Sequence, residues 1–457
     1  EVGFIDATFD PQIDFAARPA TLDITFRITE GKLVRIGKIR VIGNSITRGK
    51  VIRRELEFFP EQELNVKAIR DSERRLRNTG LFEQSQGGVR ITSVPTADPQ
   101  VRDIIVEVKE TETGRIFFGA GVSSDLGVLG NLGYTEQNFD IHDRPENSRE
   151  FWRGEAFKGA GQTFSINLQP GTELQRYSIS FVEPYIFDRD VSLHLSAYYT
   201  SWDRIIYDEV RGGTTVGLGK RLSKYWRGFA TLRLEAIRIE DIDIIAPKDV
   251  TDVKGSSGLT SITLRMTRDK TDNRFDPSTG TFIAASLEQT GVLGGDYTFT
   301  KLSLDGRRYW TVLQDAFDRK SVLAARGHIG YIAGDAPIFE RFYAGGHGSI
   351  RGFDYRGAGP HKVGEPVGGD FLLLLGGEYS FPIYGNNLRG VFFLDTGTVE
   401  STGSLNDYRA TAGFGLRFQL PIPGQMNVPF DFAFAFPIAK GPDDETQVFS
   451  FTIGRSF

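Results

Sequence analysis

The sequence has no cysteine at all, and it contains only 2 methionines and 5 histidines among 457 residues. Without cysteine the chain can form no disulfide bond, no thiolate zinc site and no cysteine nucleophile. No stretch approaches the roughly 18 consecutive apolar residues that mark a membrane-spanning helix. This does not exclude a membrane, because a transmembrane β-barrel hides its apolar face in the alternation of each strand.

Sequence motifs of the common enzyme classes are also missing. There is no HExxH, no GxSxG, no P-loop and no GxGxxG motif. We therefore expect no enzyme, no catalytic residue, no cofactor and no metal site. The formal net charge of −5 argues against a general polyanion binder, since such domains are usually strongly basic. Nucleic acid is thus not an expected partner.

The N-terminal part of the chain mixes short strands and helices. Residues 31–110 predict strand, helix, helix, strand, strand, over 34–42, 48–58, 65–79, 82–92 and 102–108. Gly80 follows the second helical pattern as a C-terminal cap. Residues 1–30 hold two short extended runs, which we interpret as the C-terminal remnant of a preceding copy of this module. Because no initiator methionine or signal peptide is visible at Glu1, we expect a processed or trimmed chain.

The abundant residues are 53 glycines and 36 phenylalanines, and they follow a strand period after residue 115. In residues 408–418 one face is apolar and aromatic, whereas Arg409 and Arg417 share the other face with glycine. Charge and glycine on one face are typical of the wet lumen of a membrane barrel. We therefore predict an all-β transmembrane barrel of 16 antiparallel strands over residues 111–457. The expected strands lie near 115–123, 127–139, 162–169, 174–183, 190–202, 206–221, 224–239, 258–268, 280–290, 297–310, 320–333, 366–380, 388–398, 408–420, 426–437 and 446–457.

The predicted barrel has an order of connections that sets its two ends. An even number of strands brings both ends of the sheet to one side, which is also the side of the helical module. Residues 334–365, between the eleventh and twelfth strands, then form the longest loop at the opposite, outer end.

Three motifs on these strands carry a family resemblance. The long loop contains GGHGSIRGF at 345–353; GEYSFP at 377–382 is followed by FFLDTG at 392–397; and the chain stops at Phe457 after an amphipathic strand. With the RRLRNTGLF stretch at 74–82, they span nearly the whole chain in a consistent order. The chain resembles the superfamily of POTRA-plus-barrel insertases and translocases, and within it the BamA family of outer-membrane protein assembly factors. Members of that family usually carry several POTRA domains, whereas only one is complete here.

The resemblance implies both a location and partners. The barrel would lie in a bacterial-type outer membrane with the POTRA module in the periplasm. It would fold and insert β-barrel proteins, so that its substrates are unfolded outer-membrane barrel proteins. Outer-membrane lipids, accessory lipoproteins and periplasmic chaperones would be further partners, as in a BAM complex.

The resemblance also indicates which residues act. In the loop it implies an anchor motif of Ile350, Arg351, Gly352 and Phe353. An arginine can pair with carboxylates through its planar fork, and strand alternation points Glu378 into the lumen, with Asp395 expected there too. The resemblance implies that the motif arginine contacts such wall carboxylates, so we expect Arg351 to contact Glu378 and Asp395, with Gly352 allowing a close approach.

A lateral gate between the first and last barrel strands is the implied mechanism. Glycine weakens strand pairing, and an opened seam would expose backbone groups to an incoming strand. The expected gate residues are Arg115, Phe117, Gly119 and Gly121 on the first strand, and Phe449, Phe451, Ile453, Gly454 and Phe457 on the last. A two-partner secretion translocator, a TamA-like assembly protein and a passive porin remain alternatives.

Overall fold

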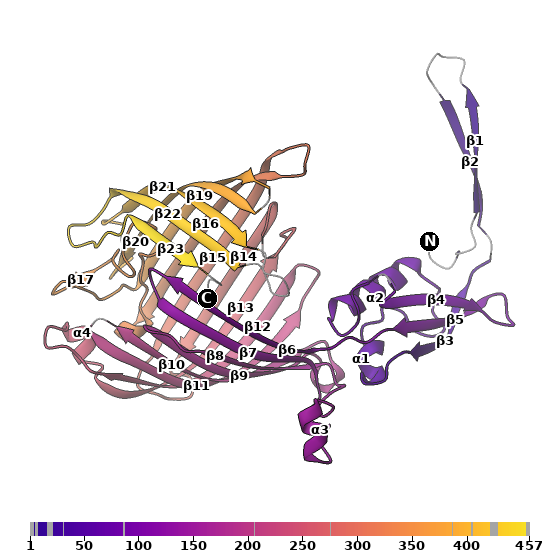
Figure 1. Ribbon diagram of the computed structural model, residues 1–457, viewed down its shortest axis with the longest axis horizontal. Helices are drawn as coiled ribbons and strands as arrows, with labels where there is room; N and C mark the ends of the chain where they lie inside the picture. Colours follow the sequence, from indigo (N-terminus) through magenta and orange to yellow (C-terminus); the bar gives the residue numbers. More distant parts are fainter. Residues whose placement is uncertain are drawn as a thin grey trace. The chain divides into compact units, whose positions relative to one another are not determined.

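The computed structural model describes residues 4, 8–15, 22–30, 32–85, 87–204, 206–274, 276–385, 387–403, 405–420 and 428–453. The chain forms two compact units, and Figure 1 shows their elements. The first unit comprises residues 1–115 and 135–164, and the second comprises residues 116–134 and 165–457. Within the described ranges no helix is long and apolar enough to cross a membrane.

A three-stranded sheet with two helices makes up most of the first unit (Figure 1). Its elements in chain order are β3 (Arg35–Ile42), α1 (Gly49–Arg53), α2 (Val66–Asn78), β4 (Val89–Pro95) and β5 (Val101–Val108). The sheet order is β3-β5-β4, with β5 parallel to β3 and antiparallel to β4. This is the strand, helix, helix, strand, strand order that the sequence predicts.

The core of this domain follows from the apolar periods of its elements. Leu76 on α2 and Ile104 on β5 are completely buried, and Val51 and Ile52 on α1 join them in one cluster. Full burial of such a side chain contributes about 1.5–3 kcal/mol. Helix α2 starts where the Asn65 side chain accepts hydrogen bonds from the first-turn amides.

Two boundaries in this domain differ from the prediction. Helix α1 ends at Arg53 rather than near residue 58, because the Glu57 amide donates to the Ser72 hydroxyl on α2 and draws the chain out of the helix. The turn carries Phe58 into the core. Strand β4 begins at Val89 rather than at residue 82, where Phe82 forms only an isolated bridge with Glu110.

Glu110 joins the end of β5 to the loop before α1. Its carboxylate accepts the backbone N–H groups of Ser45, Ile46 and Thr47 and the Ser45 hydroxyl. Burial alone would raise the pKa of Glu110, but the hydrogen bonds from Thr47, Ser45 and Ile46 outweigh it and lower this pKa from 4.5 to about 2. The ionised carboxylate therefore stabilises this loop.

Two further strands, β1 (Thr8–Phe15) and β2 (Leu22–Thr29), form an antiparallel hairpin of their own. Large apolar side chains on it are exposed, including Ile13, Ile24 and Phe26. A two-stranded hairpin is marginally stable by itself in water, so these side chains form a surface suited to contact with other apolar groups.

Sixteen antiparallel strands close into the predicted barrel. In spatial order the ring runs from β6 through β16, continues from β19 through β23, and returns to β6. The strands are β6 (Gly114–Ser123), β7 (Gly127–Phe139), β8 (Gln162–Gln169), β9 (Leu174–Glu183), β10 (Ser192–Arg204), β11 (Tyr207–Arg221), β12 (Trp226–Glu240), β13 (Gly255–Asp269), β14 (Gly280–Thr290), β15 (Phe299–Gln314), β16 (Lys320–Gly334), β19 (Phe371–Tyr384), β20 (Leu388–Glu400), β21 (Arg409–Leu420), β22 (Val428–Ala439) and β23 (Phe449–Ile453).

The two faces of the barrel wall differ as the alternation predicts. On the outward face Phe414 and Phe434 are exposed and stacked on each other. Their neighbours Arg409 and Thr411 point inward and are buried. Such an outward band of aromatic and aliphatic side chains is suited to lipid, whereas the inward face carries the charges.

Short helices and the long loop complete the connections. Among the described residues, the helices that follow the three-stranded sheet are α3 (Ser148–Arg153), η1 (Ile186–Asp188), α4 (Lys248–Thr251) and η2 (Ile338–Glu340). The long loop, residues 335–370, joins β16 to β19 and includes η2, β17 (His361–Lys362) and β18 (Glu365–Pro366). It extends beyond the predicted 334–365 because the strand that follows it begins at Phe371 rather than at residue 366.

Candidate functional site

The long loop is packed against the inward face of the barrel. Ile350 and Phe353 are each only 1% exposed, and they share a cluster with Ile332 on β16, Leu372 on β19 and Val399 on β20. Apolar burial on this scale holds a loop in one place, whereas a solvated loop of this length would be mobile. The loop is therefore a fixed part of the barrel interior.

Arg351 lies at the centre of a buried ion-pair cluster in this loop. Its Nε and Nη2 donate to the two carboxylate oxygens of Asp395 on β20, at 2.7 and 3.1 Å. Its Nη1 donates to Glu378 on β19 at 3.0 Å. The guanidinium carbon also lies 3.5 Å from the ring centroid of Phe393. The structure thus brings together the loop arginine and both wall carboxylates that the sequence singles out.

A glycine in the wall allows a second arginine to reach the same carboxylate. Arg326 on β16 and Asp395 on β20 both pair in register with Gly376, which lies between them on β19. Across this gap the Arg326 Nη2 donates to Asp395 at 2.9 Å and to the Ser349 carbonyl of the loop at 2.7 Å. Asp395 is completely buried, and two arginines share its charge, as a buried carboxylate requires.

Gly352 fits where no side chain would. Its φ of +93° lies in the left-handed region that favours glycine. A β-carbon here would lie 3.1 Å from both the Cβ and the carbonyl oxygen of Ala435 on β22, and 3.2 Å from the Thr411 methyl. The loop backbone therefore lies directly on the wall beside Arg351.

The ion pairs continue from Glu378 toward the last strands. Arg417 on β21 donates to Glu378 at 3.0 Å and to Asp431 on β22 at 2.9 Å. The His347 Nε2 of the loop lies 3.6 Å from the same Asp431. Arg351 and His347 therefore contact one connected series of charges.

His347 also contacts both sides of the seam between the first and last strands. Its backbone N–H donates to Asp125, in the turn after β6, at 2.8 Å. Its Nδ1 lies 3.2 Å from the Ser450 hydroxyl on β23. The loop thus bridges the two edges that close the barrel.

The seam is formed by β6 and β23. Thr452 pairs with Ser123 and Ile453 with Val122, and the Ser124 amide donates to the Phe451 carbonyl at 3.1 Å. At these positions β6 and β23 meet and the barrel sheet closes.

The described gate residues that the sequence predicts lie on these two strands. On β6, Arg115 and Gly119 are exposed, Gly121 is buried and the Phe117 ring covers Gly133 of β7. On β23, the Phe449 ring stacks on Phe432 and on Phe451. Ile453 pairs with Val122 at the seam. Gly454 and Phe457 lie outside the described residues.

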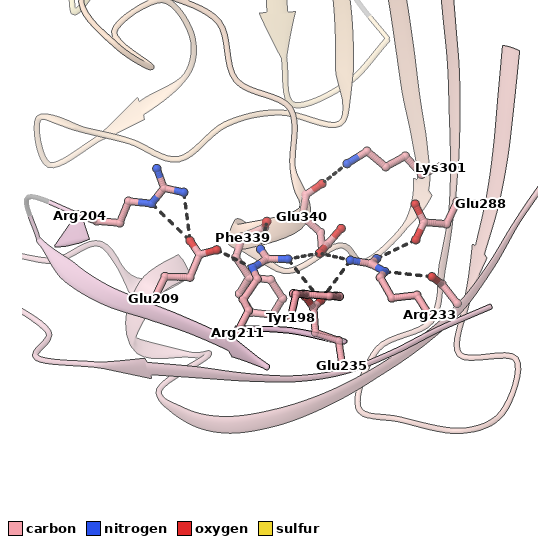
Figure 2. Close-up of polar contacts among 11 residues, drawn as sticks. Tyr198, Arg204, Glu209, Arg211, Arg233, Glu235, Glu288, Lys301, Phe339 and Glu340 are labelled. Atoms are coloured by element: carbon pink, nitrogen blue, oxygen red, sulfur yellow. Dashed lines mark hydrogen bonds and ion pairs between the residues drawn. The ribbon is translucent and has the colours of Figure 1, made fainter. Parts of the chain in front are cut away.

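A second ion-pair cluster, which the sequence reasoning missed, binds the start of the long loop (Figure 2). Glu340 on η2 is 6% exposed, and its Oε1 accepts from Arg211 on β11 at 2.9 Å and from Arg233 on β12 at 3.3 Å. Glu288 on β14 and Glu235 on β12 balance the charge of Arg233. The loop is therefore held by the wall at two separate places.

One feature of the sequence could have indicated this cluster. Arg211 and Arg233 stand two residues from Glu209 and Glu235 on the inward faces of their strands, and charges there need partners. The partner Glu340, however, is more than 100 residues away, and Phe339 beside it contributes a carbonyl that no pattern marks. Among the described residues no group of histidine or carboxylate side chains is placed to hold a metal ion.

Comparisons with known proteins agree with this architecture. Residues 34–111 match the POTRA model, described as a surface antigen variable number repeat, and residues 157–457 match the Omp85 superfamily domain. The chain is 28% identical to the outer membrane protein assembly factor BamA of Nitratidesulfovibrio vulgaris and 25% identical to that of Neisseria meningitidis, covering 100% and 96% of this chain. It spans only 56% and 59% of the length of these relatives.

A solved structure has the same fold. The crystal structure of BamA from Haemophilus ducreyi lacking POTRA domains 1–3 aligns with a TM-score of 0.76 at 23% identity, covering 100% of this chain and 90% of that one. The match of the Omp85 model to most of the chain, together with the closed sixteen-stranded barrel, establishes the family. This chain belongs to the Omp85 superfamily and joins a POTRA domain to an Omp85 barrel.

Proposed function

We propose that this chain is part of an outer-membrane protein assembly factor that folds β-barrel proteins and inserts them into the outer membrane. The barrel lies in that membrane with its POTRA domain in the periplasm. The observation that carries the proposal is the Omp85 barrel joined to a POTRA domain, whose sheet closes where β6 meets β23.

The proposed mechanism follows from what an open seam would present. An unpaired strand edge exposes backbone N–H and C=O groups, which are costly in lipid and which template a new strand. A substrate strand could pair with β6 or β23 and so be protected while it enters the membrane. The gate residues predicted on these two strands would form that template, and no bond chemistry is involved.

The long loop has a supporting role in this proposal. The anchor motif would hold the loop on β19 and β20 through Arg351, and His347 would link it to both seam strands. The loop would then stabilise the closed seam, and its contacts with Asp125 and Ser450 would be lost when the seam opens.

The POTRA domain would receive substrates and partners. Its edge strands β3 and β4 flank the central β5, and an exposed edge can accept an extended segment by strand addition. We propose unfolded barrel proteins, accessory lipoproteins and periplasmic chaperones as its ligands. We also propose that residues 1–30 are the end of a preceding POTRA domain, which would cover the apolar side chains exposed on the β1–β2 hairpin.

A disulfide across the seam tests the mechanism. The chain has no native cysteine, so Ser123→Cys with Thr452→Cys places one cysteine on each side at directly paired positions. The protein is reconstituted in lipid vesicles with an unfolded substrate barrel, and folded substrate is quantified by its heat-modifiable migration. We expect assembly to stop in the oxidised protein and to return after reduction.

A matched control separates the gate from the chemistry of crosslinking. Ser196→Cys with Thr215→Cys joins the paired strands β10 and β11 at inward positions away from the seam. This variant should assemble substrate equally well when oxidised and when reduced. Unchanged assembly by the oxidised seam variant would refute a gate, and large steady conductance in planar bilayers would favour a porin instead.

A further inference from the structure

A cavity of about 450 Å³ lies between the long loop and the wall formed by β9, β10 and β11. Among the described residues, four arginines and a single carboxylate, Glu209, line it. The arginines are Arg176, Arg204, Arg211 and Arg356. This cavity is separate from the Arg351 cluster, but it shares Arg211 and Phe339 with the Glu340 cluster.

Glu209 in the cavity and Glu340 next to it already accept hydrogen bonds from arginines of the protein. Glu209 accepts from Arg204 at 3.3 Å and from Arg211 at 2.6 Å. Arg211 further donates to Glu340 and to the Phe339 carbonyl, as Figure 2 shows. The charges of Arg204 and Arg211 are therefore balanced within the protein.

The other two arginines have donors to spare. Within the part of the chain that the structure describes, neither the Arg356 nor the Arg176 guanidinium forms a hydrogen bond or a close ion pair; Arg356 interacts with the charge of Glu209 at longer range, and Arg176 is exposed. Arg356 comes from the loop, and its guanidinium carbon lies 3.8 Å from the ring centroid of Tyr343. Arg176 comes from β9, where it pairs in register with Thr200, which also pairs with Arg211.

The backbone at Arg356 supports a specific use of this side chain. Its φ of +63° lies in the left-handed region, which is uncommon for a residue other than glycine. The turn is fixed by the Gly357 amide, which donates to the Asp354 carbonyl, and by paired backbone hydrogen bonds to Glu445. Strain of this kind is found where a side chain must be presented in one direction.

We propose that this cavity is a binding site for a phosphate group. Guanidinium forks match the oxygens of phosphate, and two forks, from Arg356 on the loop and Arg176 on the wall, suit a group with several terminal oxygens. The cavity is larger than a phosphate ion, so the group can belong to a larger molecule. The cavity lies near the Arg204 end of β10. The long loop joins β16 to β19 at the same end of the barrel.

The source of the phosphate can be a lipid headgroup or a soluble phosphate compound. The bound group would connect the loop to β9. It would thus add to the ion pairs by which Glu340 attaches the loop to β11 and β12. Binding should weaken with rising salt, because it depends on charge.

Calorimetry on the purified protein in a neutral detergent tests the site. Inorganic pyrophosphate and dihexanoyl phosphatidic acid are the two probes, and dihexanoyl phosphatidylcholine is the zwitterionic comparison. We expect Arg356→Gln and Arg176→Gln each to weaken binding about tenfold or more. Arg189→Gln, in the exposed turn before β10, is the matched control and should leave affinity unchanged.

A second variant separates binding from folding. Arg356→Gly relieves the left-handed strain, so it should fold normally by heat-modifiable migration yet bind as weakly as Arg356→Gln. Tighter binding of phosphatidic acid than of pyrophosphate assigns the site to a lipid headgroup, and binding of pyrophosphate alone assigns it to a soluble compound. Equal affinity in the wild-type protein and both Arg356 variants, or no binding of either probe at millimolar concentration, overturns the proposal.

Discussion

Replacing Arg351 by alanine gives the most direct measure of how firmly the long loop is held. The substitution removes three charge-assisted hydrogen bonds, two to Asp395 and one to Glu378. Breaking a buried ion pair costs about 3–5 kcal/mol when the partner is left alone. Here Arg326 and Arg417 still contact the two carboxylates, so we expect the lower end of that range, about 3 kcal/mol.

Hydrogen exchange of the loop amides can measure this change. Local opening lowers protection in proportion to the free energy lost, and about 3 kcal/mol corresponds to roughly a 100-fold faster exchange. We expect this acceleration in residues 345–358, with no change in the strands of the barrel wall. Arg351→Lys keeps the charge but loses the bidentate fork, and it should give an intermediate rate.

Two controls make the measurement decisive. Arg189→Ala removes an exposed arginine from a distant turn and should leave loop exchange unchanged. Asp395→Asn combined with Arg351→Ala should cost less than the sum of the single changes, because both remove the same contact. Exchange in the loop of Arg351→Ala within threefold of the wild type, in a correctly folded barrel, would show that the ion pairs do not hold the loop.

Three further predictions concern other positions. Gly352→Ala should destabilise loop docking by about 1–3 kcal/mol, through its left-handed backbone and the contact with Ala435; loop exchange as slow as in the wild type would contradict this. Glu340→Gln should speed amide exchange in residues 336–344 while leaving residues 346–353 protected, and equal effects on both segments would mean that the two clusters act as one. Because the folded pKa of Glu110 is lowered to about 2, its contribution to stability is present above pH 4.5 and lost as the pH falls toward 2. Urea unfolding of the POTRA domain should therefore depend less on pH across this window in Glu110→Gln than in the wild type, with Glu107→Gln as the exposed control.

Much of the architecture could be predicted because strand alternation is a local property. In the described residues each barrel strand lies near its predicted position, since lipid on one side and a wet lumen on the other impose a period of two on the sequence. The errors lie at boundaries that distant contacts decide. Helix α1 ends early because of the Ser72 hydroxyl, and the strand after the long loop starts late because residues 366–370 belong to that loop.

The candidate site was accessible to sequence reasoning only in part. The wall carboxylates Glu378 and Asp395 follow from inward alternation and from the family resemblance, and both lie against Arg351. The ion pairs of Glu340 with Arg211 and Arg233 could not be predicted. They depend on the register of β11 and β12 and on the path of the long loop across the lumen. The bond from Arg326 to Asp395 could not be predicted either, because it depends on Gly376 of the neighbouring strand.

That glycine has a consequence for how the wall can vary. A β-carbon at Gly376 would lie 2.6 Å from the Arg326 Nε and 2.9 Å from an Asp395 oxygen. Position 376 can therefore accept a side chain only if the bond between its two register neighbours is given up. Positions 326, 376 and 395, on three adjacent strands, should therefore vary together. Alanine at 376 should be tolerated best in a chain where Arg326 has been replaced by a smaller residue.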